Sequence, residues 1–218
     1  RAGFDNISAD LMLAIPGQTM DSMRASARFL SDIAVSHISA YLLKIEEGTP
    51  FYTMQDGLAL PDEDETAALY LGAVQELRAL GYQQYEISNF ARDGQTCRHN
   101  LIYWDCREYL GLGPAAHSFI DGQRLAYPRS IDKFLAGTPP YKTDDGGEFD
   151  EYAMLRLRLT DGLVLADAHK RYAFDEHPLR KQAQRLAAQG LYVCDDTGIR
   201  LTERGFLFSN HCIGELLF

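Results

Sequence analysis

The stretch DLMLAIPGQT, residues 10–19, determines the fold that the first part of the chain is expected to adopt. Residues 7–15 are mostly apolar and have the length of a β-strand, and Pro16 with Gly17 forms a strong stop after it. Thr19 is a favourable N-cap for the next segment, in which apolar residues recur at helical spacing. The stretch therefore predicts a strand, a tight turn and an amphipathic helix.

The same alternation continues further along the chain. Residues 37–45 form a second strand candidate, residues 62–80 a long helix that opens with four acidic residues and ends at Gly81, and residues 85–88 a third strand candidate. Strand, helix, strand, helix, strand at this spacing is typical of a parallel α/β sheet. Buried parallel strands are mostly apolar on both faces, and the first two strands nearly fit that description.

The segment over residues 90–109 breaks this pattern. It is polar, aromatic and without clear periodicity, which predicts an irregular functional segment rather than disorder. Residues 116–120 and 123–127 then flank Asp121-Gly122, a dipeptide that is typical of hairpin turns. We therefore expect a β-hairpin after the irregular segment.

A composition shift between residues 137 and 147, where Gly, Pro and Asp accumulate, predicts a linker. We expect one domain over residues 1–137 and a second over residues 145–218. The second contains three helix candidates, a two-stranded wing and a last helix, which is the pattern of a mainly helical, winged-helix-like domain. These candidates span residues 149–159, 165–172, 178–189, 191–194 with 199–201, and 202–218.

The composition is that of an ordinary acidic globular protein. Of its 218 residues, 21 are Lys or Arg and 31 are Asp or Glu, so the formal net charge is −10. An acidic balance disfavours nucleic acid as the main partner, even for a winged-helix-like module. No apolar run reaches the roughly 18 to 20 residues of a membrane span, so we expect no transmembrane segment.

The cysteines indicate the cellular compartment of the protein, and the first residue indicates whether the sequence is a fragment. Four cysteines are too few for a disulfide scaffold and contain no C-x-x-C pair, which predicts a cytoplasmic protein without a closed zinc site. The chain starts at Arg1 rather than at Met, so we expect a fragment of a longer protein. No secretory signal is visible at this start, although a truncated start says nothing about the parent protein.

Three ionisable residues lie where a ligand could bind. Asp10 lies inside an apolar strand, either as a ligand-binding carboxylate near the mouth of a barrel or as a partly exposed residue at the strand's start. Lys44 ends the second strand, where solvation is the simpler interpretation. His117 follows Gly111 and Gly113, which let the backbone approach a ligand closely, but a lone His is more often structural.

A second group of candidate ligand-binding residues lies inside the irregular segment, in a span of six residues. His99, Asn100, Tyr103 and Trp104 bring together an imidazole, an amide and two large rings. This mixture suits a flat aromatic ligand, with stacking from the rings and axial contact from the imidazole. The alternative is a surface loop that folds its aromatic side chains back into the core, and the residues alone leave both interpretations open.

Five segments together resemble one family. They are DLMLAIPGQT (10–19), ISAYLLKIEEGTPF (38–51), YEISNFA (85–91), CRHNLIYW (97–104) and YLGLGPAAHS (109–118). On these motifs the chain resembles the oxygen-independent coproporphyrinogen III oxidase-like group of radical S-adenosylmethionine proteins. Within that group it is more similar to the heme chaperone branch, because the H-N-x-x-Y-W motif distinguishes this branch from true coproporphyrinogen oxidases.

The resemblance implies a fold and an incomplete cofactor set. It implies that residues 1–137 form the later half of a partial (β/α) radical S-adenosylmethionine barrel, followed by the winged-helix-like domain. It covers essentially the whole chain but only the later part of the family protein. The family binds a [4Fe-4S] cluster through C-x-x-x-C-x-x-C, which this sequence lacks. The chain as given is therefore not expected to hold the cluster or to cleave S-adenosylmethionine. Ala14, where the family usually has Gly, is a departure for which we expect little consequence beyond tighter packing at the strand end.

The resemblance also assigns roles to matched positions. Asp10 corresponds to the strand carboxylate that binds S-adenosylmethionine, and Lys44 and His117 fall at two further positions that contact this cofactor. The four residues of the H-N-x-x-Y-W motif correspond to the motif proposed to take part in heme binding; they are His99, Asn100, Tyr103 and Trp104. No catalytic residue and no metal ligand is assigned in this chain.

The function implied for the parent protein is heme binding and delivery of heme to hemoproteins, with the cluster and S-adenosylmethionine bound beside the heme. The first alternative is an enzyme of porphyrin biosynthesis, which decarboxylates coproporphyrinogen III oxidatively by radical chemistry. The second is a non-catalytic, truncated binding module.

Overall fold

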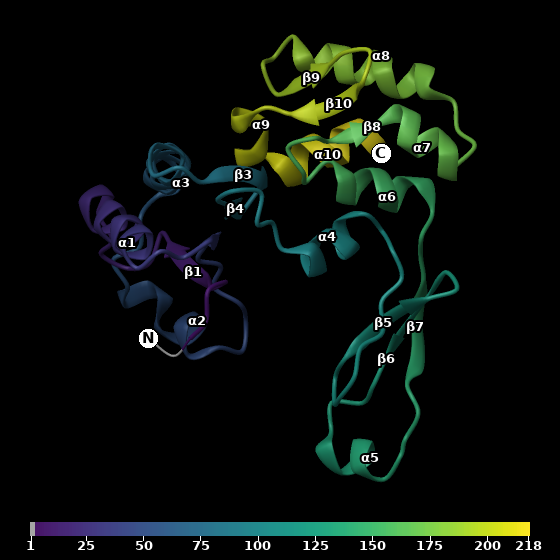
Figure 1. Cartoon of the computed structure of the whole chain (residues 1–218), viewed down its shortest axis with the longest axis horizontal. Helices are drawn as coiled ribbons and strands as arrows, with labels where there is room; N and C mark the ends of the chain where they lie inside the picture. The colour runs from purple at the N-terminus through teal and green to yellow at the C-terminus, as the bar shows by residue number, and fades with distance from the viewer. Residues whose placement is uncertain (1–2) are drawn as a thin grey trace. The chain divides into compact units, whose positions relative to one another are not determined.

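The computed structural model describes residues 3–218. The chain divides into two compact units, one up to Thr96 and one from Cys97 to Phe218, and each is described by itself (Figure 1). Both mix helices and strands, which confirms the predicted mixed α/β fold class. The division lies before the segment at 137–147 that the composition shift suggests as a linker.

The first unit begins with the predicted strand, turn and helix. Strand β1 (Ser8–Leu13) is followed by helix α1 (Met20–Asp32), whose N-terminus is closed by reciprocal hydrogen bonds between Thr19 and Ser22. Strand β2 (His37–Leu42) lies parallel to β1, with Ser8 paired to His37. The capping box removes two unsatisfied N–H groups at the first turn, which explains why the helix starts directly after Pro-Gly-Gln.

The long helix of this unit is α3 (Glu63–Ala79). Asp62 and Glu65 form its capping box, and Gly81 follows with a φ of 88°, a left-handed conformation that glycine adopts without a steric penalty. The acidic first turn is therefore both a cap and a favourable charge at the positive end of the helix. A short helix α2 (Pro50–Met54) and a 3-10 turn (Gln55–Gly57) lie in the preceding connection.

The third strand differs from the prediction. Instead of one parallel strand at 85–88, the chain forms a hairpin of β3 (Gln83–Glu86) and β4 (Asn89–Ala91). The sheet order is β1-β2-β4-β3, and β4 pairs with β2 in antiparallel fashion. The prediction of an all-parallel sheet is therefore wrong for this part. The chain reverses at residues 87 and 88, so that the second half of the YEISNFA motif pairs with β2.

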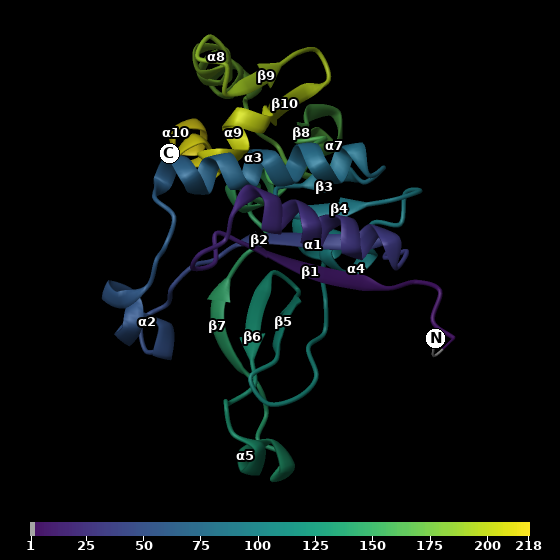
Figure 2. The ribbon, with the colours of Figure 1, turned by 90° about the vertical axis from the view of Figure 1, so that its left-hand side faces the viewer.

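Helices α1 and α3 lie along one face of this sheet (Figure 2). The strand residues on that face are apolar and buried, and they pack with the apolar sides of the two helices. They include Leu11, Leu13, Ile38, Ala40 and Phe90 on the strands, and Met23, Ala27, Leu69, Ala73 and Leu77 on the helices. Burial of these side chains, at about 25 cal/mol per Å² of apolar surface, is the main stabilisation of the unit.

The second unit opens with another departure from the prediction. Residues 90–109 were expected to be irregular, but they contain helix α4 (Arg98–Trp104). The predicted hairpin follows as β5 (His117–Ile120) and β6 (Gln123–Ala126), with Asp121 and Gly122 both at positive φ as a type I′ turn requires. A third strand, β7 (Tyr141–Asp145), pairs with β6 after the short helix α5 (Ile131–Leu135). The segment predicted as a linker therefore carries a strand.

The remaining residues form the winged-helix-like arrangement. The helices are α6 (Phe149–Arg156), α7 (Leu165–Arg171), α8 (Glu176–Ala187), α9 (Glu203–Leu207) and α10 (Ser209–Leu217). The wing strands β9 (Tyr192–Cys194) and β10 (Gly198–Leu201) pair with each other. A two-residue strand, β8 (Leu163–Val164), pairs with the other side of β10. The predicted last helix is thus divided at Phe208, and the wing has one strand more than expected.

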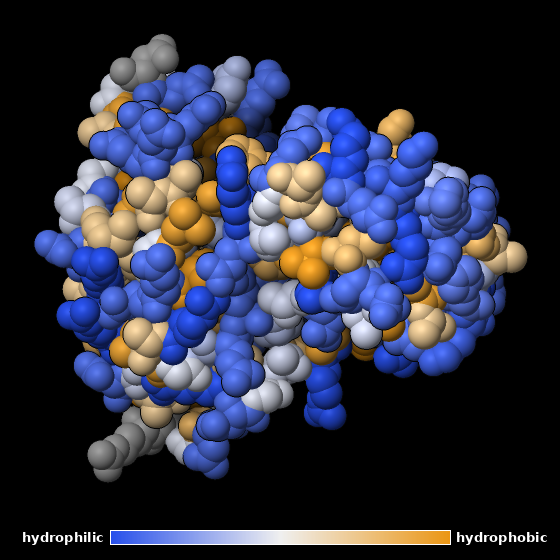
Figure 3. Space-filling model, turned by 90° about the horizontal axis from the view of Figure 1, so that it is seen from above, coloured by the Kyte–Doolittle hydropathy of each residue, from blue (hydrophilic) through white to orange (hydrophobic). Residues whose placement is uncertain are grey.

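One face of the surface agrees with the polar composition. Figure 3 shows a face on which hydrophilic side chains predominate and hydrophobic ones appear between them. Over residues 3–218, no helix combines the length and the apolar character that crossing a membrane requires.

Candidate functional site

The face of the four-stranded sheet opposite α1 and α3 is polar. Side chains alternate along a strand, so Ser8 and Asp10 of β1 share this face with His37 and Ser39 of β2. His37 and Ser39 are buried, with exposed fractions of 4% and 5%. The prediction that both strands are nearly apolar on both faces is therefore wrong: one face is apolar, and the other carries polar residues together with Met12 and Tyr41.

Four polar residues form a line across this face, which we call the polar row. Asp10 of β1 pairs with Ser39 of β2, Ser39 pairs with Asn89 of β4, and Asn89 pairs with Glu86 of β3. Asp10 is exposed, whereas Asn89 and Glu86 are 2% and 0% exposed. The row thus runs from an accessible carboxylate at the edge strand to a buried carboxylate on the far strand.

A β-bulge in strand β3 places two consecutive side chains, those of Tyr85 and Glu86, on the polar face. The register of β3 against β4 shifts between Gln84 and Glu86. Gln84 donates from Nε2 to the Tyr70 hydroxyl of α3 at 3.0 Å, so it faces the helices. Tyr85 instead reaches His37 on the polar face, and Glu86 reaches Asn89 there as well. The β-bulge therefore places two consecutive polar side chains on the same face.

Glu86 holds the side chain of Asn89 in one orientation. The Asn89 amide donates from Nδ2 to Glu86 Oε2 at 2.6 Å, and the Ser88 backbone N–H donates to the same oxygen at 2.8 Å. Because a carboxylate only accepts hydrogen bonds, this contact assigns the Asn89 nitrogen to the Glu86 side. The amide oxygen Oδ1 is buried and has no hydrogen-bond partner. A buried acceptor without a partner is uncommon and costs stability.

His37 lies next to the polar row in a chain of hydrogen bonds. Its Nδ1 is 2.8 Å from the Ser8 hydroxyl and its Nε2 is 2.7 Å from the Tyr85 hydroxyl. Burial lowers the pKa of His37, and the nearby Asp10 carboxylate opposes that effect in part. The imidazole is therefore held neutral between two hydroxyl groups, and it can act as a donor at one nitrogen and an acceptor at the other.

Asp10 and Lys44, the two residues matched to S-adenosylmethionine contacts in this unit, have different surroundings. Asp10 lies in the middle of β1, on the polar face. Lys44 lies two residues beyond the end of β2, with 81% of its side chain exposed, and its Nζ is 2.8 Å from Glu46 Oε1. Asp10 thus belongs to the polar row, whereas Lys44 is a solvated residue in a loop.

The four residues of the H-N-x-x-Y-W motif lie on helix α4 in the second unit. His99 and Tyr103 are one helical turn apart, with His99 Nε2 2.8 Å from the Tyr103 hydroxyl and the rings edge-to-face at 4.9 Å. Tyr103 in turn packs edge-to-face on Tyr109 at 4.5 Å. His99 is exposed, so its imidazole can reach a ligand, while the two tyrosine rings support it from behind.

The other two residues of the motif are also one helical turn apart. Asn100 and Trp104 are both half-buried. The Arg158 guanidinium lies over the Trp104 ring, 4.6 Å from its centre. The indole Nε1 is buried without a hydrogen-bond acceptor. The helix therefore presents the imidazole outward and packs the indole against the unit.

His117, the remaining matched residue, begins strand β5 and is exposed. The preceding Gly111 is needed for a contact within the protein: a Cβ atom there would lie 2.0 Å from the carbonyl oxygen of His117. Its N–H donates to the Ser118 hydroxyl at 2.9 Å. The close approach that Gly111 permits is therefore an approach to strand β5.

Within residues 3–218, no three His, Cys, Asp or Glu side chains are grouped so that they could hold a metal ion. Cys106 and Cys212 are buried, and burial is the main cause that raises the pKa of each thiol. A raised pKa disfavours the thiolate, which is the form that binds metals.

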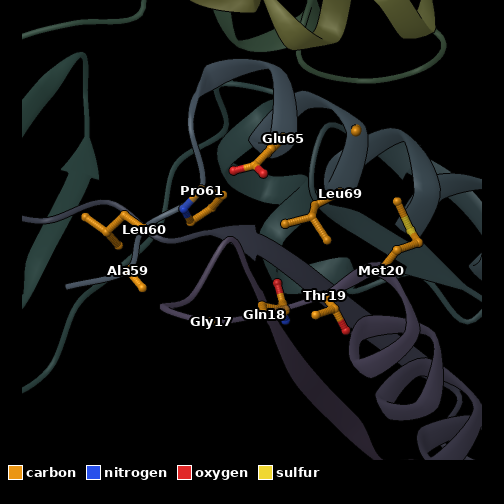
Figure 4. Close-up of a pocket in the computed structure, with 10 residues that line it drawn as sticks. Gly17, Gln18, Thr19, Met20, Ala59, Leu60, Pro61, Glu65 and Leu69 are labelled. Carbon is orange, nitrogen blue, oxygen red and sulfur yellow. The ribbon is translucent and has the colours of Figure 1, made fainter.

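A cavity of about 550 Å³ lies on the helix side of the first unit (Figure 4). Gln18, Thr19 and Met20 stand on one side of it, and Pro61, Glu65 and Leu69 stand opposite. Its lining is mainly apolar, and the Thr19 hydroxyl and the Glu65 carboxylate are already engaged in the capping boxes of α1 and α3. The Gln18 side chain accepts from the Ala14 N–H and donates to the Met12 carbonyl, so it too is held by local hydrogen bonds.

The sequence-based prediction missed His37, Ser39, Glu86 and Asn89. A signal for the first two was present in HISAYL, where polar and apolar residues alternate with the period of a strand that is buried on one face. Glu86 and Asn89 carried no such signal, because their position on the polar face depends on the β-bulge and on the hairpin.

Comparisons with known proteins agree with this architecture. Residues 149–208 match the family profile of the HemN C-terminal domain. The chain is 33% identical to the heme chaperone HemW of Bacillus subtilis over 226 residues, which cover 99% of this chain and 60% of that protein. It is 30% identical to HemW of Lactococcus lactis, with coverage of 100% and 60%.

A solved structure supports the fold. Coproporphyrinogen III oxidase (HemN) from Escherichia coli superposes with a TM-score of 0.75 over 99% of this chain and 55% of that chain, at 16% sequence identity. This likeness concerns the fold alone. The chain spans about 60% of the length of the two HemW relatives. Together the matches relate the chain to the HemN-like radical S-adenosylmethionine family, in its HemW branch, over the C-terminal portion of those proteins.

Proposed function

We propose that the protein to which this chain belongs binds heme and delivers it to hemoproteins. The observation that carries the proposal is the similarity to two heme chaperones over essentially the whole chain, at 33% and 30% identity. In the same proposal, residues 1–137 are the later part of a radical S-adenosylmethionine barrel, residues 145–218 are the C-terminal domain, and the protein acts in the cytoplasm.

Helix α4 provides the groups that would contact heme as cargo. His99 is exposed and offers an imidazole nitrogen, which is a common axial ligand of heme iron. Tyr103, packed edge-to-face against His99 and Tyr109, adds an aromatic surface beside it. Heme is flat and apolar with acidic edges, so an imidazole flanked by rings matches its chemistry.

The polar row supports the binding of S-adenosylmethionine by the first unit. Asp10 presents a carboxylate and Asn89 presents a buried oxygen that has no donor. Both are acceptors, and the ammonium, ribose hydroxyl and adenine amino groups of S-adenosylmethionine are donors, so the residues fit the cofactor. When bound, the cofactor supplies radical chemistry; the residues of this chain would bind and orient it.

The iron–sulfur cluster does not fit this chain. The sequence has no C-x-x-x-C-x-x-C motif, and the described residues contain no group of three potential ligands. We therefore assign the cluster to no residue between 1 and 218 and derive no step through it.

Heme titration of the chain tests the proposal. We expect a shifted Soret band with saturable binding, and about tenfold weaker binding or a changed band for His99→Ala, because an axial ligand is lost. The matched control is His177→Ala, which removes an exposed histidine from helix α8 and is expected to leave the titration unchanged. No shift with the unaltered chain, or equal loss in both variants, would contradict heme binding at α4.

A further inference from the structure

The polar row contains an acceptor that the fold itself does not use. The Asn89 Oδ1 atom is buried and has no hydrogen-bond partner, although the side chain is 2% exposed and fixed by Glu86. Leaving such an atom without a donor is unfavourable, because the hydrogen bond it makes to water in the unfolded chain is not replaced. An apolar side chain at this position would avoid that cost, so the oxygen requires an explanation.

The position of Asn89 relates it to Asp10. The two residues belong to the same row and are separated by one strand, on which Ser39 lies between them. Neighbouring strands are about 4.8 Å apart, so Asp10 and Asn89 are separated by about 10 Å. A molecule of nucleoside size can span this distance and bring hydrogen-bond donors to both residues.

The local structure keeps the acceptor pointing in one direction. Rotation of the Asn89 amide by 180° would place its oxygen against the Glu86 carboxylate, two acceptors at 2.6 Å, which is repulsive. The Ser88 N–H holds Glu86 in turn at 2.8 Å. The hairpin between β3 and β4 is therefore built so that Asn89 presents an oxygen, and not an amino group, on the polar face.

We infer that Asn89 is a ligand-binding residue whose Oδ1 accepts a hydrogen bond from a hydroxyl or amino group of the molecule that Asp10 binds, and that Glu86 is its positioning residue. This inference rests on the proposed binding of S-adenosylmethionine at Asp10. Asn89 is then the second ligand-binding residue of that site, two strands away from Asp10. The ligand supplies the hydrogen-bond donor that the buried Oδ1 lacks in the protein alone.

The test is calorimetric titration of S-adenosylmethionine into the chain and into single variants. We expect Asp10→Ala to lose most of the binding and Asn89→Ala to bind about three- to tenfold more weakly, as the loss of one hydrogen bond predicts. Glu86→Ala should weaken binding to a similar extent. Glu86→Gln should restore it, because its amide oxygen can still accept from Asn89.

The matched control is Gln84→Ala. It removes an amide from the same hairpin, but Gln84 faces α3 and the Tyr70 hydroxyl, on the opposite side of the sheet. The affinity of the Gln84→Ala variant for S-adenosylmethionine is expected to equal that of the unaltered chain. Thermal unfolding of every variant separates lost contacts from lost folding, and Asn89→Ser, which shortens the side chain, serves if Asn89→Ala does not fold.

The outcomes separate the inference from the proposed function. Weaker binding of both Asp10→Ala and Asn89→Ala, with Gln84→Ala unchanged, supports the inference. Loss of binding in Asp10→Ala alone would overturn it while retaining the proposed cofactor site, and Oδ1 would then serve an internal water only. Absence of saturable binding by the unaltered chain would overturn both the inference and the S-adenosylmethionine part of the proposed function.

Discussion

The two candidate sites are constructed in opposite ways. The polar row lies on a sheet, and its inner members Asn89 and Glu86 are fully buried and joined by a 2.6 Å hydrogen bond. The α4 site consists of an exposed imidazole on a seven-residue helix, held by a hydrogen bond to Tyr103 one turn away. The first is fixed before a ligand arrives, whereas the second can rearrange at little cost.

This difference suits the two kinds of ligand in the proposed function. A cofactor that must be oriented benefits from a rigid, desolvated set of acceptors, because little entropy is lost when it binds. A cargo that must be released benefits from an accessible ligand on the surface. The contrast between a rigid and an adjustable site has measurable consequences, of which the effect on folding stability is expected to be the largest.

The first prediction compares Glu86→Ala with His99→Ala. Removing the Glu86 carboxylate leaves the Asn89 amide and the Ser88 N–H without their acceptor inside the protein, so we expect a loss of about 3 kcal/mol of unfolding free energy. His99→Ala removes an exposed side chain and should cost less than about 0.5 kcal/mol. Urea unfolding measures both. Equal costs would remove the contrast between the two sites.

The second prediction concerns pH and the buried imidazole. Because burial lowers the pKa of His37 below its ordinary value of 6.5, the unfolded chain binds this proton more readily than the folded chain. The contribution of His37 to the free energy of unfolding is therefore fully present above about pH 6.5 and is lost as the pH decreases. The total loss is about 1.4 kcal/mol for each unit by which folding lowers the pKa of His37.

The variant His37→Gln keeps a donor and an acceptor but does not titrate. Urea unfolding between about pH 7.5 and about pH 5 should therefore show a smaller loss of stability for His37→Gln than for the unaltered chain. Gln84→Ala gives the comparison, since it removes a side chain that does not titrate from the same sheet and should keep the pH dependence of the unaltered chain. A pH dependence that is the same in all three proteins would argue against a buried neutral His37.

The third and smallest effect is expected at Tyr103. Its hydroxyl occupies Nε2 of His99 at 2.8 Å, so heme iron that binds this nitrogen must break the contact. Tyr103→Phe keeps the ring that packs on Tyr109 and should raise heme affinity about two- to threefold, as the loss of one weak, solvent-exposed hydrogen bond predicts. Heme titration followed at the Soret band measures it. Unchanged affinity would show that the hydroxyl does not compete at Nε2.

Much of the fold was predictable because it depends on local chemistry. Thr19 and Asp62 begin helices by capping, and Asp121-Gly122 forms a type I′ turn, all of which are interactions within a few residues. The β3–β4 hairpin was not predictable in this way. Its existence depends on whether residues 89–91 pair with β2, and that is a contact between segments some 50 residues apart.

The residues of the candidate sites also fall into those that local sequence motifs predict and those that only the pairing of distant strands brings together. Asp10 and the H-N-x-x-Y-W motif were found in the sequence, although the motif was expected in an irregular segment and lies on helix α4. Ser39 and Asn89 were not found, because a serine and an asparagine in short strands are inconspicuous. Only cross-strand pairing puts them in line with Asp10.

The sequence by itself determined the α/β class, the capped starts of α1 and α3, the β5–β6 hairpin and the motifs that resemble the family, since each of these depends on residues close together along the chain. Only the tertiary structure decided which face of the sheet is polar, that Glu86 and Asn89 share it, and that Asn89 Oδ1 is left without a donor. The physical reason is that β-bulges, strand order and burial are set by pairing between distant segments, and a buried acceptor without a partner becomes visible only when every neighbour is in place.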